Sequence, residues 1–175
     1  MIKKIIVITF LVFGFLIAQQ SIGGTPYSIE HRLLDVSNKI TLPVLNIDQL
    51  LEEDRNAPLA TPFRYGYKFD VNLSLHNSGE WLDLDNGDRI WKLSIYSKDA
   101  YAICLEYDQF YLPDGASLFI YNENNSMVLG AYTKDNNQDD MLFAANIYGQ
   151  YSSVLAQGNW YKIATNKFSI IEKSL

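Results

Sequence analysis

The feature that most constrains this chain is an alternation of apolar and polar side chains that begins at Tyr67. In 67–75, YKFDVNLSL, Tyr67 and each second residue after it are apolar or aromatic, and the residues between them are polar. Successive side chains of a β-strand point to opposite faces, so the pattern predicts a strand with one buried face. The same alternation returns in RIWKLSIYS and YAICLEYDQF, and shorter apolar runs follow at 117–123, 127–133, 142–149 and 151–156.

Segments rich in Gly, Asn, Asp and Pro separate these runs, and such residues tolerate the backbone dihedrals of turns. Short strands at this spacing predict an all-β fold, an antiparallel β-sandwich of jelly-roll-like type. A domain of about 150 residues buries roughly 70% of its extended-chain surface, so a core needs no disulfides. The one cysteine, Cys104, lies in an apolar run and is predicted to be a buried, inert thiol.

The first twenty residues have the features of a secretory signal peptide. Lys3 and Lys4 precede an apolar run from Ile5 to Ala18, and a small residue stands where cleavage is expected. A retained membrane anchor is the alternative, but fourteen helical residues cover only about 21 Å of a roughly 30 Å hydrocarbon core. We therefore expect a secreted or periplasmic protein, with no membrane partner after cleavage.

The charge of the chain argues against nucleic acid as a partner. Loss of the signal removes two lysines and no acidic residue, so the formal net charge goes from −6 to −8. Phosphate contacts need clustered Lys and Arg, which such an acidic domain lacks.

Between the signal and the strands, 21–62 is predicted to be a linker and pro-like segment with one short helix. The helix is expected in NIDQLLEEDRNA, with Asp48 as its N-cap.

The densest cluster of acidic residues is 83–88, DLDNGD. An EF-hand loop needs Asp or Asn at its fifth position and Glu at its twelfth. Counted from Asp83, those positions hold Gly87 and Ser94, so the spacing does not fit calcium. The pair Asn86-Gly87 between two alternating runs instead predicts a hairpin with a type I′ turn.

No catalytic, metal or cofactor site is predicted. HNSGEW could suggest Ser78 as a nucleophile beside His76, but it has no G-x-S-x-G elbow and no converging carboxylate. The second histidine, His31, precedes the strands, and two histidines without metal spacing do not predict zinc. The pattern therefore favours a turn at 77–79.

Aromatic side chains offer a different kind of site. Trp91 alternates with Leu93 on the expected core face, whereas Trp81 flanks a turn and is expected to be more exposed. Trp81 is thus the candidate ligand surface for a glycan, with ordinary packing as the alternative.

A series of motifs, taken in order, resembles the region that precedes the protease domain in secreted, trypsin-like lysyl-endopeptidase proteases of the Bacteroidetes type. The series spans about residues 41–145 and consists of Pro62, Arg64 and Gly66; Asn77-Ser78-Gly79 with Trp81; Gly87-Asp88-Arg89-Ile90-Trp91; Leu112-Pro113 with Gly115-Ala116; Leu118-Phe119-Ile120-Tyr121-Asn122; and Gly130-Ala131-Tyr132-Thr133 with Asn136-Asn137. The resemblance implies a β-sandwich over 63–157 and leaves 158–175 as a divergent tail.

In that family the catalytic triad lies in a separate downstream domain, so no catalytic residue is carried over. The resemblance implies a non-catalytic domain that assists folding, inhibition or positioning of a trypsin-like protease domain. A stand-alone surface or carbohydrate-binding module, and the remnant of a disrupted protease gene, are the alternatives. A protease-coding frame directly downstream would favour a split or disrupted protease, and an unrelated gene would favour a stand-alone module.

Overall fold

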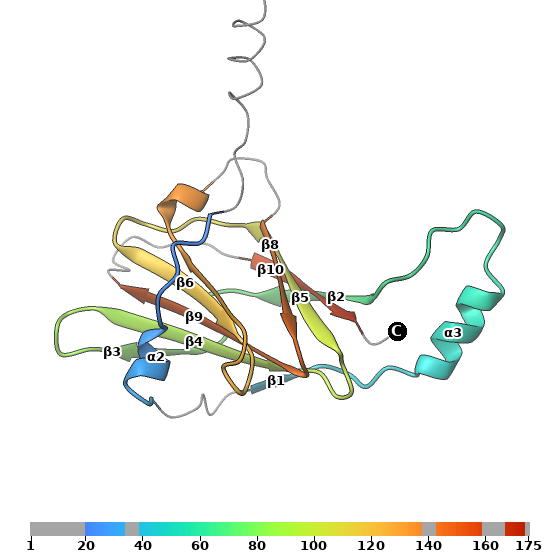
Figure 1. Ribbon diagram of the computed structural model, residues 1–175, viewed down its shortest axis with the longest axis horizontal. Coiled ribbons are helices and arrows are strands. Elements are labelled where there is room, and N and C mark those ends of the chain that lie inside the picture. The colour runs from blue at the N-terminus through green and yellow to red at the C-terminus, as the bar shows by residue number, and fades with distance from the viewer. Residues whose placement is uncertain (1–19, 34–38, 138–142, 159–166, 174–175) are drawn as a thin grey trace, which may run out of the picture.

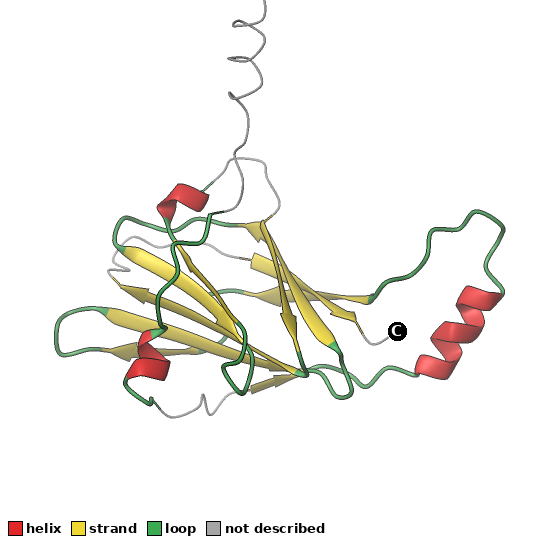
Figure 2. Cartoon of the chain, viewed as in Figure 1, coloured by secondary structure: helices red, strands yellow, loops and turns green. Residues whose placement is uncertain are grey.

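The computed structural model describes residues 20–33, 39–137, 143–158 and 167–173, and these consist mainly of strands (Figures 1 and 2). The strands form two sheets, one of six strands and one of four. One hydrophobic core contains side chains from both sheets. The predicted all-β sandwich is therefore confirmed.

The six-stranded sheet has the order β1-β4-β9-β6-β7, and β3 also pairs with β4. Its strands are β1 (Lys39–Thr41), β3 (Glu80–Asp83), β4 (Arg89–Tyr96), β6 (Ala116–Tyr121), β7 (Val128–Tyr132) and β9 (Tyr151–Gly158). All pairings in this sheet are antiparallel except that of β1 with β4.

The four-stranded sheet is antiparallel and has the order β2-β10-β5-β8. Its strands are β2 (Tyr67–Leu73), β5 (Ala102–Gln109), β8 (Phe143–Tyr148) and β10 (Lys167–Lys173). The strand β10 lies between β2 and β5, inside the segment expected to be a divergent tail. The six-stranded sheet includes β1 and the four-stranded sheet includes β10, and both strands lie outside the range 63–157 that was predicted for the sandwich.

The core follows the predicted alternation. Trp91, Leu93 and Ile95 of β4 are at most 1% exposed. In β5 the alternation holds from Ile103 to Tyr107, but Tyr101 is 71% exposed because it precedes the strand. Successive side chains of a strand point to opposite faces, so Cys104 points away from the core face that Ile103 occupies. Cys104 is half-buried, and the prediction of a buried thiol is wrong.

The segment after the expected signal peptide packs on the outer face of the six-stranded sheet. Residues 22 and 23 form backbone hydrogen bonds with Ala131 of β7, each 3.1 Å long. The short helix α2 (Tyr27–Glu30) follows, and the segment then contacts a second, smaller apolar cluster on this face. The cluster comprises Ile90, Phe119, Tyr121, Ala131 and Leu155, with Tyr27, Ile29 and Leu33 packed against it. Residues 20–33 are therefore part of the fold.

Two further helical elements are described. The predicted helix is α3 (Ile47–Arg55), and η1 (Lys134–Asn136) is a single 3₁₀ turn. The N-cap of α3 is Asn46, whose side chain accepts a hydrogen bond from the Gln49 amide at 3.2 Å. The predicted cap, Asp48, instead lies in the first turn, where its charge complements the helix dipole.

The expected signal peptide, residues 1–20, lies almost wholly outside the described residues. Within the described part of the chain, no helix is long and apolar enough to cross a membrane.

Candidate functional site

The acidic run 83–88 forms the tip of the β3–β4 hairpin. The Leu84 amide donates to the Asp88 carbonyl at 2.9 Å, and the Asn86 side chain accepts from the Asp88 amide at 3.0 Å. The predicted hairpin is confirmed, but the predicted type I′ turn is wrong, because Gly87 has a positive φ (+87°) and Asn86 does not. The three-residue loop instead suits a type I turn followed by a left-handed glycine.

Among the residues that the structure describes, no group of three or more His, Cys, Asp or Glu side chains is placed to hold a metal ion.

Residues 77–79 form the predicted turn. The Ser78 hydroxyl donates to the Ser74 carbonyl at 2.8 Å and accepts from the Ser74 amide at 3.1 Å. The Ser78 carbonyl accepts from the Trp91 indole N–H at 2.8 Å, so the turn is fixed to the core. His31 stacks on Tyr27 beside α2, in a different part of the fold.

Trp81, the predicted ligand surface, is half-buried and more exposed than Trp91, as expected. Its indole N–H donates to the Leu75 carbonyl at 3.0 Å, and it packs against the main core. The Arg89 guanidinium lies 4.6 Å from the ring centroid. Arg89 thus lies over one face of the ring.

A surface that the sequence did not single out is the excursion between β1 and β2, residues 43–66, which we call the arm. Figure 1 shows α3 and the following loop standing away from the two sheets. The loop exposes large apolar side chains within seven residues: Leu59 is 103%, Phe63 83% and Tyr65 58% exposed.

The arm is nevertheless held in shape by charge. Arg64 donates to Glu53 at 3.1 Å and to Asp54 at 3.0 Å, and so joins the loop to the end of α3. The Thr61 hydroxyl donates to the Pro58 carbonyl at 2.7 Å. These contacts present the apolar side chains from an ordered loop.

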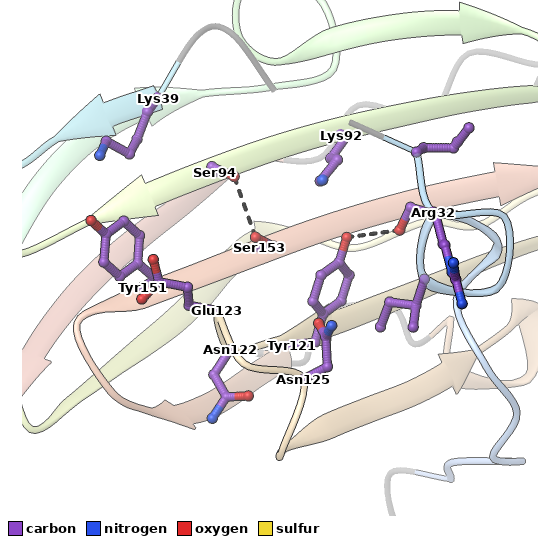
Figure 3. Close-up of a pocket in the computed structure, with 13 residues that line it drawn as sticks. Arg32, Lys39, Lys92, Ser94, Tyr121, Asn122, Glu123, Asn125, Tyr151 and Ser153 are labelled. Atoms are coloured by element: carbon purple, nitrogen blue, oxygen red, sulfur yellow. Dashed lines mark hydrogen bonds between the residues drawn. The ribbon is translucent and has the colours of Figure 1, made fainter. Parts of the chain in front are cut away.

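The second surface is a cavity of about 670 Å³ on the outer face of the six-stranded sheet, which we call the basic cavity. Its described lining includes three cationic side chains, Arg32, Lys39 and Lys92, and one acidic side chain, Glu123. Figure 3 shows Lys92 beside the hydrogen-bonded hydroxyls of Ser94 and Ser153 and near Tyr121. The Tyr121 hydroxyl lies 2.9 Å from that of Ser28. Lys92 is 9% exposed, whereas Arg32 and Lys39 are exposed at the sides.

An adjoining cavity of about 480 Å³ shares three lining residues with the basic cavity, namely Asn122, Glu123 and Tyr151. We call it the tyrosine cavity, because Tyr96, Tyr101, Tyr148 and Tyr151 line it. Asn124 and Gln150 add amide groups.

Sequence reasoning missed both cavities. Lys92 and Ser94 occupy the polar positions of an alternating run, which predict a face in water. The α2 segment packs beside this face and makes it concave, and that packing joins residues far apart in the chain. The only local signal was the basic side chain in the middle of β4.

No protein-family model matches the chain, and a search of curated proteins found no match. The fold and these surfaces define a β-sandwich domain with one projecting arm and one hollowed sheet face.

Proposed function

We propose that this chain is a secreted, non-catalytic domain that binds a trypsin-like protease domain and assists its folding or positioning, with the arm as the contact surface. The carrying observation is the exposure of Leu59, Phe63 and Tyr65 on an ordered loop. Single exposed apolar residues are common in proteins, but large apolar groups gathered on one projecting segment are typical of binding surfaces.

The resemblance to pre-protease regions supports the same surface. Its first matching motif, Pro62, Arg64 and Gly66, lies within the arm. Arg64 and its two carboxylates brace the loop, and the motif places Phe63 and Tyr65 on either side of Arg64. Aromatic residues are enriched at protein interfaces, because they bury large areas with few rotatable bonds.

The ion pairs also bear on the kind of binding. A substrate-like inhibitor of a trypsin-like protease inserts a free Lys or Arg side chain into the specificity pocket. Arg64 is instead paired with Glu53 and Asp54. This pairing favours folding assistance or positioning over substrate-like inhibition.

The test is binding of the purified protein, without its signal peptide, to a purified lysyl-endopeptidase domain, measured by calorimetry. We expect Leu59→Ser with Phe63→Ser to raise the Kd at least about tenfold, because interface anchors of this size contribute most of the binding energy. Tyr101→Ser is the control, since Tyr101 is also a large exposed side chain, 71% exposed, but lies outside the arm. The refolding yield of the protease domain should fall with the same double variant.

Equal affinity of the arm variant and the wild type would contradict the arm as the contact surface. Cleavage of a Lys- or Arg-containing peptide by the protein alone, persisting after rigorous removal of contaminants, would contradict the non-catalytic assignment. Binding that is lost whenever a peptide substrate occupies the protease site would favour inhibition instead.

A further inference from the structure

We infer that the basic cavity and the tyrosine cavity together form a binding groove for an oligosaccharide that carries an acidic group, either a carboxylate or a sulfate. The basic cavity lies on the outer face of the six-stranded sheet, and the adjoining tyrosine cavity also takes Tyr148 from β8 of the other sheet. Neither cavity uses a residue assigned to the arm. The groove is therefore a second site, independent of the proposed protease contact.

The first argument is charge. Among the described residues that line the basic cavity, three are cationic and one is acidic, although the whole chain has a formal net charge of −6. A concave, partly desolvated surface focuses the field of its charges, so this is a place where an anionic group is favoured. A long, uniformly charged polyanion would be repelled by the rest of the molecule, which favours a ligand with only one or two acidic groups.

The second argument is the supply of hydrogen-bonding groups beside the cations. The Ser94 and Ser153 hydroxyls lie 3.3 Å apart next to Lys92 (Figure 3). A hydroxyl donates once and accepts twice, so this pair retains capacity toward ligand oxygens. Carboxylate and sulfate oxygens form their strongest hydrogen bonds with such charged and polar donors.

The third argument is the aromatic end of the groove. Lys39 Nζ lies 4.7 Å from the ring centroid of Tyr96 and 4.9 Å from that of Tyr151, so it stands where the two cavities meet. Beyond it, Tyr101 is 71% and Tyr148 65% exposed. A sugar ring has an apolar C–H face and a polar edge, which suit exposed tyrosine rings beside amide side chains.

The size of the groove fits more than one sugar unit. Each cavity falls within the range of about 300–1,000 Å³ that is usual for small-molecule sites. The shared residues Asn122, Glu123 and Tyr151 lie between the acidic-group end and the tyrosine end. We therefore assign the acidic group to the basic cavity and the neutral units to the tyrosine cavity.

The experiment is calorimetric titration of the protein, without its signal peptide, with three matched probes: 3′-sialyllactose, 3′-sulfated lactose and lactose. We expect at least one acidic probe to bind about tenfold more tightly than lactose. This preference should shrink as salt is raised to about 0.5 M, because exposed charges are then screened. The better acidic probe identifies carboxylate or sulfate as the preferred group.

Two sets of variants separate the ends of the groove. Arg32→Gln with Lys39→Gln should raise the Kd of the acidic probe about tenfold and leave that of lactose unchanged. Tyr148→Ala should weaken all three probes alike. The control is Lys68→Gln, which removes the same type of charge from β2 in the other sheet, and it should change the Kd less than about twofold.

The inference would be overturned by no binding of either acidic probe at millimolar concentration, by equal binding of acidic probes and lactose, or by an unchanged Kd in the Arg32 and Lys39 double variant. The variants Arg32→Gln and Lys39→Gln are at exposed positions, so a folding defect is not expected, and circular dichroism checks this. Loss of binding in Leu59→Ser with Phe63→Ser would place the site on the arm and would also overturn it.

Discussion

The sandwich body and the arm are built from similar apolar residues but use them in opposite ways. In the body, Leu93 and Ile95 have no exposed surface. In the arm, Leu50 of α3 is buried, but Leu59 and Phe63 of the following loop are almost fully exposed. Arg64 of this loop forms salt bridges with Glu53 and Asp54. Burial of apolar surface is the main favourable term in folding, so the body carries the stability of the protein. The loop of the arm leaves large apolar side chains exposed, and the proposed protease contact would use this surface.

The largest expected effect comes from truncating the same residue type in each region. Leu93→Ala should lower the free energy of unfolding by about 3 kcal/mol, because it removes buried methyl groups and leaves a cavity. Leu59→Ala should change it by less than about 0.5 kcal/mol. Urea denaturation of both variants measures the difference. Equal losses would mean that Leu59 is packed in solution and would break the comparison.

A second pair of variants compares two glycines and separates the effect of a steric clash with the body from the effect of backbone strain alone. Gly79 and Gly87 both have positive φ, so alanine at either position is strained by about 1–2 kcal/mol. At Gly79 the new Cβ would also lie 2.6 Å from the Trp91 ring and 2.7 Å from the Lys92 carbonyl oxygen, whereas nothing lies within 4 Å at Gly87.

We therefore expect Gly79→Ala to reduce stability by about 1–3 kcal/mol more than Gly87→Ala does, since overpacking adds to the strain. Thermal or urea unfolding gives the comparison. Similar values for the two variants would show that the turn at 77–79 moves away from Trp91 without cost.

The smallest expected effect is a pH dependence that belongs to the body. Burial, and to a lesser extent the charge of Tyr132, raises the pKa of the Tyr107 phenol far above its ordinary value. The folded protein thus keeps this proton when the unfolded chain loses it. The stabilisation is complete below about pH 10 and is lost as the pH rises further, by at most about 1.4 kcal/mol per pH unit.

Denaturant titrations at about pH 9 and 11 measure this loss. Tyr107→Phe should reduce the difference between the two pH values, and Leu59→Ala in the arm should leave it unchanged. An undiminished pH dependence in Tyr107→Phe would assign it to other groups.

Much of the body could be predicted from the sequence, because a strand with one buried face shows its period in every second residue. Trp91, Leu93 and Ile95 illustrate this, and the Asn86-Gly87 hairpin was found from its turn residues. Sequence patterns did not predict the features that depend on contacts between distant parts of the chain. Cys104 lies in an apolar run, but it occupies a position of the strand that points to the outer side. The strand β10 could not be recognised as a central strand from its own residues.

The candidate sites were harder to predict for the same reason. The arm's apolar residues could not be told from core residues by type alone, because exposure depends on what the rest of the chain covers. Lys39 and Lys92 come together only through the parallel pairing of β1 with β4, a pairing between segments about fifty residues apart. Trp81 was predicted to be an exposed ligand surface because it lies beside a turn. The sequence did not predict that the Arg89 guanidinium lies over its ring.

The position of β10 imposes an order on biosynthesis. A chain that emerges with its N-terminus first presents β2 and β5 early, yet these strands pair with β10 and not with each other. Their facing edges stay open until residues 167–173 emerge, and open strand edges readily pair with other chains. The four-stranded sheet can therefore close only after residues 167–173 have been synthesised, and the interval before closure is when the protein is most exposed to aggregation.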